Sequence, residues 1–352
     1  MPLSDLSLAD LRDFRPEVAE PADFDEFWAT TIAESRAAGG AVSLSDADTP
    51  VTHLRVHDLT FPGFAGEPIR AWVTRPHGDE PLPAVIEYLG YGGGRGLPHE
   101  RLHWAASGHV HIVMDTRGQG SHWGGGGGTP DPHGSGPSVS GFMTRGIESP
   151  QDYYYRRVFT DAVRLVDAVR ELPFVDSDRI AVTGGSQGGG ITLAVAGLVP
   201  GLAAALPDVP FLCHFRRSVE ITPGNPFAEI AQYLAVHRGA TDGVFQTLSY
   251  FDGVNFARRA TAPALFSVAL MDAVVMPSSV FAAFNNYGAH ADIEVYEFNG
   301  HEGGEGHHWL RQVAFIRSRQ ECERPAGANP DRPSALLTAY CWVSGNSLSL
   351  SL

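Results

Sequence analysis

Cysteine is scarce in this chain, and its few copies are spaced for neither disulfides nor a metal ion. The three cysteines, Cys213, Cys322 and Cys341, form no paired framework and none of the short C-x-x-C spacings that bind zinc. Secreted domains that depend on disulfides carry such frameworks, so this pattern favours a reducing compartment.

Basic charge and long apolar runs are also lacking. The 352 residues include 25 Lys and Arg against 40 Asp and Glu, which gives a net charge of −15 and a pI near 5.4. Nucleic acids and anionic membranes attract basic surfaces, so neither is expected as a partner, and a solvated acidic surface accounts for the charge. No apolar run could span a bilayer, and the first residues show no basic segment followed by an apolar stretch. We therefore expect a cytoplasmic protein.

Glycine, in contrast, is abundant, and the apolar content is high. The chain has 40 glycines, and 43% of its residues are hydrophobic, which is enough for a large core. Chains of this size that alternate strands and helices commonly form one domain with insertions. We expect one domain over residues 1–322, with a helical and β extension at its N-terminal end. Residues 323–352 form an atypical tail whose Pro- and Gly-rich start is typical of a linker.

The most informative motif is G-x-S-x-G at residues 184–188, Gly-Gly-Ser-Gln-Gly. The apolar stretch 179–183 before it predicts a strand, and the stretch 189–196 after it predicts a helix. A strand, a tight turn and a helix form the context in which this motif exposes a nucleophilic serine at the carboxyl edge of a parallel sheet. Ser186 is therefore the candidate nucleophile. The alternative is a glycine-rich turn without chemistry.

The rest of the chain alternates predicted strands with helices. Inner strands are expected at residues 83–89 and 109–115, and a long helix at residues 152–172. Residues 51–75 alternate around a Gly-Phe-Ala-Gly turn, which indicates an antiparallel pair at the edge of the sheet. This pattern, with the serine motif, predicts an α/β-hydrolase three-layer sandwich with a mostly parallel central sheet. A further helix is expected to open at residues 22–28, with Asp23 and Glu26 at capping-box spacing.

A serine nucleophile needs a base and an orienting acid, which in this fold follow it in the order Ser, Asp or Glu, His. Asp272 ends the predicted strand 263–270, and His301 follows the predicted strand 292–298. Both are thus expected at the sheet edge that carries Ser186.

Other residues compete for these roles. His307 and His308 fall inside the predicted final helix, about residues 304–319. Their side chains would point wherever the helix face dictates. Asp252 precedes no comparable strand end and is typical of a turn or a cap.

Two loops complete the predicted site. Residues 90–96 follow an inner strand at the place where this fold forms its oxyanion hole, so we expect the backbone N–H groups of Tyr91 and Gln187 to be the two donors. A flexible surface loop is the alternative for residues 90–96. The second loop runs from residue 116 to residue 143, and Trp123 and Phe142 within it favour a packed, ordered cover. Arg117, near its start, is expected to brace a neighbouring segment through its planar fork of donors.

Three motifs in this order and spacing resemble the signatures of carbohydrate esterase family 7, the acetyl xylan esterases and cephalosporin C deacetylases. They are Arg-Gly-Gln at 117–119, Gly-Gly-Ser-Gln-Gly at 184–188 and His-Glu at 301–302. The similarity extends over about residues 3–320. Supporting stretches are residues 142–146, 153–158, 210–217, 248–256 and 280–283.

The resemblance implies a Ser186–Asp272–His301 triad, an oxyanion hole at Tyr91 and Gln187, and neither a metal nor an organic cofactor. It also implies a small acetyl pocket, and homo-oligomers of the dimer-of-trimers hexamer type. The positions of this sequence that match the pocket are Tyr91, Phe211, Pro226 and Val274.

The activity that the resemblance implies is removal of O-acetyl groups from acetylated xylo-oligosaccharides, other small acetylated sugars and cephalosporin C-type esters. Two departures from the family pattern stand out. Val275 and Met276 replace a cysteine and a proline after the acid, so a looser acid loop is expected, and Gly92 stands where many members have asparagine. A serine peptidase, another small-ester hydrolase and an inert scaffold of the same fold are the alternative functions.

Overall fold

The computed structural model describes residues 5–134, 136 and 138–322, so the predicted tail at 323–352 lies outside the described residues. Within these described residues, nine strands form one sheet in the order β1-β2-β3-β5-β4-β6-β7-β8-β9. From β5 to β9 neighbouring strands are parallel, whereas β1, β2 and β3 pair antiparallel and β3 joins β5 antiparallel. The strands are β1 (Ser43–Asp46), β2 (Leu54–Pro62), β3 (Pro68–Pro76), β4 (Leu82–Tyr88), β5 (Val110–Met114), β6 (Val175–Gly185), β7 (Ala204–Asp208), β8 (Ala264–Ala269) and β9 (Ala291–Tyr296).

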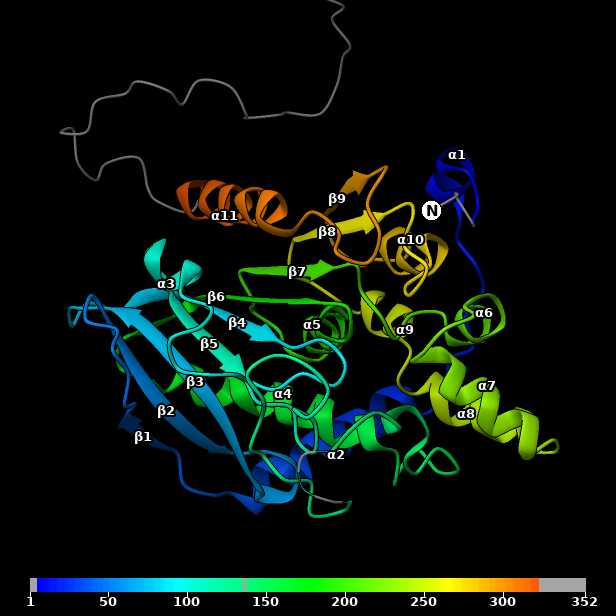
Figure 1. The fold of residues 1–352 in the computed structure, drawn as a ribbon, viewed down its shortest axis with the longest axis horizontal. Helices are drawn as coiled ribbons and strands as arrows, with labels where there is room; N and C mark the ends of the chain where they lie inside the picture. The colour runs from blue at the N-terminus through cyan, green and yellow to red at the C-terminus, as the bar shows by residue number, and fades with distance from the viewer. Residues whose placement is uncertain (1–4, 135, 137, 323–352) are drawn as a thin grey trace, which may run out of the picture.

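Helices cover both faces of this sheet, as predicted for a three-layer sandwich (Figure 1). Side chains of β4 alternate between two hydrophobic clusters. Ala84 and Ile86 join the large core beneath α4 and α5, and Val85 joins a smaller cluster with Trp104 of α3 and Val313 of α11. The helices are α1 (Leu8–Asp13), α2 (Phe24–Ala38), α3 (His103–Ala106), α4 (Tyr154–Arg170), α5 (Gln187–Leu198), α6 (Phe215–Ile221), α7 (Phe227–Val236), α8 (Thr241–Ser249), α9 (Gly253–Ala257), α10 (Pro277–Asn285) and α11 (Glu305–Cys322), with short 3₁₀ helices η1 (Phe64–Gly66) and η2 (Phe142–Thr144).

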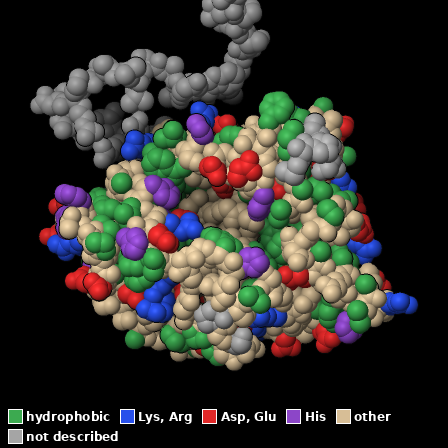
Figure 2. Space-filling view, viewed as in Figure 1, with side chains coloured by type: hydrophobic (Ala, Val, Ile, Leu, Met, Phe, Trp, Pro, Cys, Tyr) green, Lys and Arg blue, Asp and Glu red, His purple; other side chains and the backbone are tan. Residues whose placement is uncertain are grey.

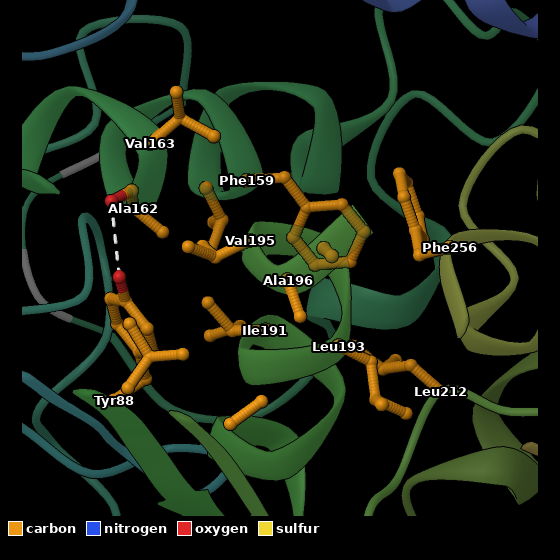
Figure 3. Close-up of a cluster of buried hydrophobic side chains, with 14 of the residues drawn as sticks. Tyr88, Phe159, Ala162, Val163, Ile191, Leu193, Val195, Ala196, Leu212 and Phe256 are labelled. Carbon is orange, nitrogen blue, oxygen red and sulfur yellow. Dashed lines mark hydrogen bonds between the residues drawn. The ribbon is translucent and has the colours of Figure 1, made fainter. Parts of the chain in front are cut away.

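The helix that follows the serine motif, α5, lies in the middle of the large core. Its side chains are buried from Gln187 through Ala196, and Ile191 and Val195 face Phe159 of α4 (Figure 3). The hydroxyl of Tyr88, at the end of β4, donates to the carbonyl of Ala162 at 3.1 Å, which ties the sheet to α4. Packing on every side therefore holds α5, and with it the start of the helix where Ser186 lies, in one position.

One local prediction is confirmed only in part, and another is wrong. The antiparallel pair expected at 51–75 is β2 and β3, but β1 lies outside it and forms the edge of the sheet. All four residues of β1 are exposed, so the strand has no alternating apolar pattern by which it could be predicted. The expected capping box at α2 does not form, because the carboxylate of Asp23 accepts a hydrogen bond from the hydroxyl of Tyr250 at 2.6 Å instead.

Charges of both signs are interspersed over the face shown in Figure 2, which is hollowed near its centre. Within residues 5–134, 136 and 138–322, no helix is long and apolar enough to cross a membrane.

Candidate active site

Ser186 occupies the sharp turn between β6 and α5. Its backbone has φ 57° and ψ −119°, a positive φ that is unusual for a residue with a side chain. The turn passes so close to β4 that a Cβ on Gly188 would lie 2.1 Å from the carbonyl oxygen of Tyr88. The second glycine of the motif is therefore required by backbone packing, and the strained turn projects the serine from the carboxyl edge of the sheet.

The three residues predicted from strand ends meet at this edge. The Oγ of Ser186 lies 3.0 Å from Nε2 of His301, and Nδ1 of His301 lies 2.8 Å from Oδ2 of Asp272. Asp272 is buried, whereas about one third of the His301 side chain is exposed. A carboxylate only accepts hydrogen bonds, so the Asp272 contact favours a proton on Nδ1 of His301, with Nε2 as the acceptor that faces the Ser186 hydroxyl.

The loop that carries Asp272 is anchored, although Val275 and Met276 led us to expect a looser one. The backbone N–H groups of Val274 and Val275 donate to Oδ1 of Asp272 at 2.8 and 2.9 Å. Val275 and Met276 are themselves buried, at 1% and 4% exposed. Apolar packing and the two amides thus hold the loop.

The N-terminal segment adds a second anchor to the same region. The carboxylate of Asp5 accepts from the backbone N–H of Ser278 in α10 at 2.7 Å and from Arg217 of α6 at 3.0 Å. Arg217 also donates to the hydroxyl of Ser278 at 2.7 Å. Asp5, 273 positions before Ser278, therefore binds the first turn of the helix that follows the Asp272 loop.

The rival residues have other surroundings. Asp252 caps α9 and accepts from the amides of His214, Phe215 and Val254, and burial raises its pKa to about 6. His308 is buried against Tyr296 of β9, with Nδ1 3.1 Å from the tyrosine hydroxyl, and burial lowers its pKa. His307 is exposed on α11. None of the three hydrogen-bonds to Ser186 among the described contacts.

The two backbone N–H groups expected to form the oxyanion hole lie at the ends of elements that flank Ser186. Tyr91 follows β4 and Gln187 opens α5. Among the described residues, neither amide has an acceptor within the protein. Both are therefore available to a ligand oxygen.

Side-chain contacts that the sequence analysis did not predict hold these amides in place. The amides of Gln187 and Gln119 pair reciprocally, at 2.9 and 3.2 Å, and both residues are fully buried. Gln119 also accepts from the backbone N–H of Gly92 at 2.7 Å, and the hydroxyl of Tyr155 donates to Gln187 at 2.9 Å. Gly92 itself has φ 80° and leaves no room for a Cβ beside His122. The 90–96 loop is thus tied to the start of α5, and not a flexible surface loop.

A pocket of about 360 Å³ opens beside Ser186 and His301. Pro226 and Val274, two of the predicted pocket residues, line it together with Tyr91. Phe211 does not line it. It is fully buried and packs behind the wall, with ring centroids 4.4 Å from Phe227 and 6.4 Å from Tyr91. The other lining residues are Gly90, His122, Trp123, Ser140 and Asn225.

A comparison with known protein families shows to which family the chain belongs. The family model described as acetyl xylan esterase (AXE1) matches residues 1–319. The chain belongs to the acetyl xylan esterase family. Its family and its relatives identify the protein as a carboxylic ester hydrolase that acts on acetyl esters.

Solved and curated relatives agree. An acetyl xylan esterase from Paenibacillus sp. R4 is 38% identical, covers 89% of this chain and 99% of its own, and has a TM-score of 0.83. Acetyl xylan esterase 1 from Thermoanaerobacterium sp. JW/SL YS485 is 33% identical over 90% of this chain and 99% of its own, with a TM-score of 0.82. Acetyl esterase Axe7A of Xylanibacter ruminicola is 25% identical over 308 residues, and the chain spans 65% of that curated relative's length.

In this acetyl xylan esterase family member, the long 116–143 loop packs over the site. The buried carboxylate of Asp115 accepts from Gly128 N–H at 2.8 Å, from Thr129 N–H at 2.9 Å and from Arg95 N–H at 3.0 Å. Trp123 pairs with Gly93 in a parallel bridge, and its Nε1 donates to the carbonyl of Tyr91 at 2.7 Å. The cover predicted at this loop is therefore ordered in its described residues.

Arg117 has the structural role that was predicted, because it binds carboxylates of segments next to the long loop. Its guanidinium is fully buried and donates to Asp161 of α4 through Nε at 2.6 Å and Nη2 at 2.7 Å. Nη1 donates to Glu67 at 2.5 Å, and it lies 3.4 Å from Asp131 of the long loop. Burial alone would lower the pKa of Arg117, but the negative charges of Asp161 and Glu67 outweigh burial and raise this pKa above its ordinary value.

Within the part of the chain that the structure describes, no group of His, Cys, Asp and Glu could hold a metal ion.

Proposed function

We propose that this esterase removes O-acetyl groups from small acetylated sugars, xylo-oligosaccharides above all, through an acetyl-enzyme on Ser186. The observation that carries the proposal is the hydrogen-bonded chain from Ser186 through His301 to Asp272, beside a pocket of about 360 Å³. A nucleophile, a base and an acid in this order are the requirements of serine-based acyl transfer.

The first half of the reaction acylates the serine. Nε2 of His301 takes the proton of Ser186 as Oγ attacks the acetyl carbonyl carbon. Asp272 holds the imidazole in the correct tautomer and stabilises the imidazolium. The amides of Tyr91 and Gln187 donate to the oxyanion, and the loss of one such donor typically costs about 3 kcal/mol of barrier.

The second half releases acetate. His301 gives its proton to the leaving sugar oxygen, the C–O bond of the ester breaks, and the alcohol departs. Water enters, loses a proton to His301, attacks the acetyl carbonyl and frees Ser186 with acetate as the product. Every proton taken by His301 is returned, so the enzyme ends the cycle unchanged.

The walls of the pocket support a small acyl group and a neutral alcohol. In this proposal Pro226 and Val274 bound the acyl side, and no Asp, Glu, Lys or Arg is among the described residues that line the pocket. Trp123, 41% exposed, presents an aromatic surface at the rim, and hydroxyl-rich rings pack well on such surfaces. Cephalosporin C-type esters are a second substrate class of this proposal.

The test compares the wild type with Ser186→Ala, and with Ser45→Ala as the matched control on exposed strand β1. Wild type and Ser45→Ala should cleave p-nitrophenyl acetate equally, whereas Ser186→Ala should not. Acetate release from acetylated xylo-oligosaccharides and from cephalosporin C then ranks the substrates. Cleavage of a dipeptidyl p-nitroanilide in preference to the acetyl esters would refute the proposal and favour a serine peptidase.

We further propose that copies of this chain assemble into a hexamer. The proposal rests on the resemblance of the sequence motifs to family members that form dimers of trimers. Strand β9 lies at the edge of the sheet, and Phe298 and Leu310 nearby are 80% and 59% exposed, which supports self-association on that side. Light scattering should give six times the chain mass of 37.8 kDa, and a monomer in dilute solution would refute it.

A further inference from the structure

A carboxylate outside the triad joins three segments of the active site. Glu229 lies in the first turn of α7, three residues after Pro226. Both of its carboxylate oxygens lie 2.8 Å from the hydroxyl of Tyr91. The same carboxylate accepts from the backbone N–H of Gly141 at 3.2 Å and from that of Met143 at 3.2 Å. It thus binds the residue that carries an oxyanion-hole amide and the end of the long loop at once.

The tyrosine hydroxyl at the centre of this contact has a full set of partners. It donates to Glu229 and accepts from the N–H groups of Phe142 at 2.8 Å and of Gly141 at 3.1 Å. Burial and the negative charge of Glu229 raise the pKa of Tyr91, so the hydroxyl keeps its proton and continues to donate. A hydroxyl offers one donor and two acceptor positions, and all are in use.

The backbone of Tyr91 is held from the other side. Its carbonyl accepts from Nε1 of Trp123 at 2.7 Å, and its ring packs edge-on against Phe142 with centroids 5.5 Å apart. The contact to Glu229 fixes the far end of the side chain. With both ends held, the Tyr91 amide can keep one direction relative to Ser186, which is what preorganised stabilisation of an oxyanion requires.

We propose that Glu229 is a positioning residue that orients the Tyr91 amide toward the oxyanion, an inference that rests on the proposed serine esterase function. Its charge is essential to this role. Three donors converge on the carboxylate, the Tyr91 hydroxyl, which lies equally close to both oxygens, and the backbone N–H groups of Gly141 and Met143. A glutamine would turn an NH₂ group toward N–H donors, which breaks the cluster while keeping the volume of the side chain.

Because α7 starts beside Pro226, the same contact also links the acyl wall to the oxyanion hole. Phe227, the next residue, packs against Phe211 with centroids 4.4 Å apart. A shift of Glu229 would therefore move the wall and the Tyr91 amide together. Misplacement of a catalytic donor by about 1 Å can cost on the order of 100-fold in rate.

The experiment compares Glu229→Gln with Glu148→Gln as the matched control. Glu148 also binds α7, through the hydroxyl of Tyr233 at 2.9 Å, but it makes no contact with Tyr91 in the described structure. For p-nitrophenyl acetate we expect kcat of Glu229→Gln to fall about 10- to 100-fold while KM changes less than about twofold. Glu148→Gln should match the wild type.

Methylboronic acid separates a positioning role from a merely structural one. It adds to Ser186 and places one oxygen in the oxyanion hole, so it reports transition-state binding. Its inhibition constant should rise in Glu229→Gln by about the factor by which kcat/KM falls, and thermal melting should show that the variant is folded. Tyr91→Phe removes the hydroxyl from the other side and should show the same two changes.

Several results would overturn the inference. A normal kcat in folded Glu229→Gln would do so, and so would a reduced kcat with an unchanged boronate constant. If Glu229→Gln does not fold, Tyr91→Phe decides, and wild-type values for it refute the role of the cluster. Full activity of Ser186→Ala would instead refute the proposed function, so the two failures are distinguishable.

Discussion

Replacement of Arg117 by lysine tests whether this residue acts on stability or on substrate. The guanidinium is fully buried and makes three hydrogen bonds of 2.7 Å or less, two to Asp161 and one to Glu67. Burial raises the pKa of Asp161 even with Arg117 beside it, so its carboxylate depends on this partner. A lysine keeps the charge but places a single ammonium where a planar fork now reaches two carboxylates.

The expected cost follows from these contacts. The lysine ammonium can pair with only one of the two carboxylates. The other carboxylate loses its charge-assisted hydrogen bonds, each of which contributes about 1.5–3 kcal/mol to stability. Removal of a whole partner from a buried ion pair costs about 3–5 kcal/mol. We therefore expect Arg117→Lys to lower the free energy of unfolding by about 3 kcal/mol, which corresponds to a Tm lower by about 4 °C in a chain of this size.

Urea unfolding and thermal melting measure this change, and Arg36→Lys is the matched control. Arg36 binds Asp167 with the same two-bond geometry, at 2.9 and 2.9 Å, but half of its side chain is exposed. An exposed pair contributes less than about 1 kcal/mol, so this control should lose little. Turnover of Arg117→Lys should fall secondarily, because Gln119, two residues on, holds Gly92 and Gln187. Wild-type melting with a large rise in KM alone would show that Arg117 contacts substrate instead.

Three further predictions address the acyl wall, the serine turn and pH. Val274→Ala should shift preference from acetyl toward propionyl and longer esters, by about 1–3 kcal/mol per methylene accommodated, and equal wild-type rates on acetyl and octanoyl esters would contradict a closed acyl wall. Gly188→Ala should destabilise by about 3 kcal/mol or more, because its Cβ meets the Tyr88 carbonyl oxygen at 2.1 Å, whereas Gly185→Ala, with nothing within 4 Å, should lose less than about 1 kcal/mol in the same urea titration. Burial lowers the pKa of His109 to about 4, so its contribution to stability is present above pH 6.5 and is lost as the pH falls toward 4. Unfolding at pH 5 should therefore need about 2 kcal/mol less than at pH 7 on account of this residue, and His109→Gln should reduce that difference, which an unchanged difference would disprove.

The residues that sequence reasoning placed at the site share one property. Ser186, Asp272 and His301 each follow a strand that an apolar pattern predicts. The carboxyl ends of parallel strands lie at the same edge of the sheet, so the three side chains meet there. The roles of Tyr91 and Gln187 were predicted from the same logic, through the loops next to those strand ends. Local pattern and the chain order of a known fold were sufficient to bring Ser186, His301 and Asp272 together, and the oxyanion roles of Tyr91 and Gln187 stay predictions.

What could not be predicted has no local signal. The exposed strand β1 (Ser43–Asp46) lacks an apolar alternation, and Asp23 stands at capping spacing but is captured by Tyr250. The family resemblance assigns Phe211 to the acetyl pocket, yet the neighbouring rings of Phe227 and Tyr91 bury it behind the pocket wall. For Asp23 and Phe211 a residue distant in sequence contributed to the outcome, because side-chain partners in a packed core compete with local preferences.

The sequence by itself determined the α/β sandwich, the serine turn and the two strand ends that carry the proposed base and acid, because periodicity and turn chemistry are properties of neighbouring residues. Only the tertiary structure decided what holds that chemistry in place. Glu229 meets Tyr91 across 138 positions, and Asp5 caps Ser278 across 273. Such contacts depend on how distant elements pack against one another, and no spacing along the chain encodes them.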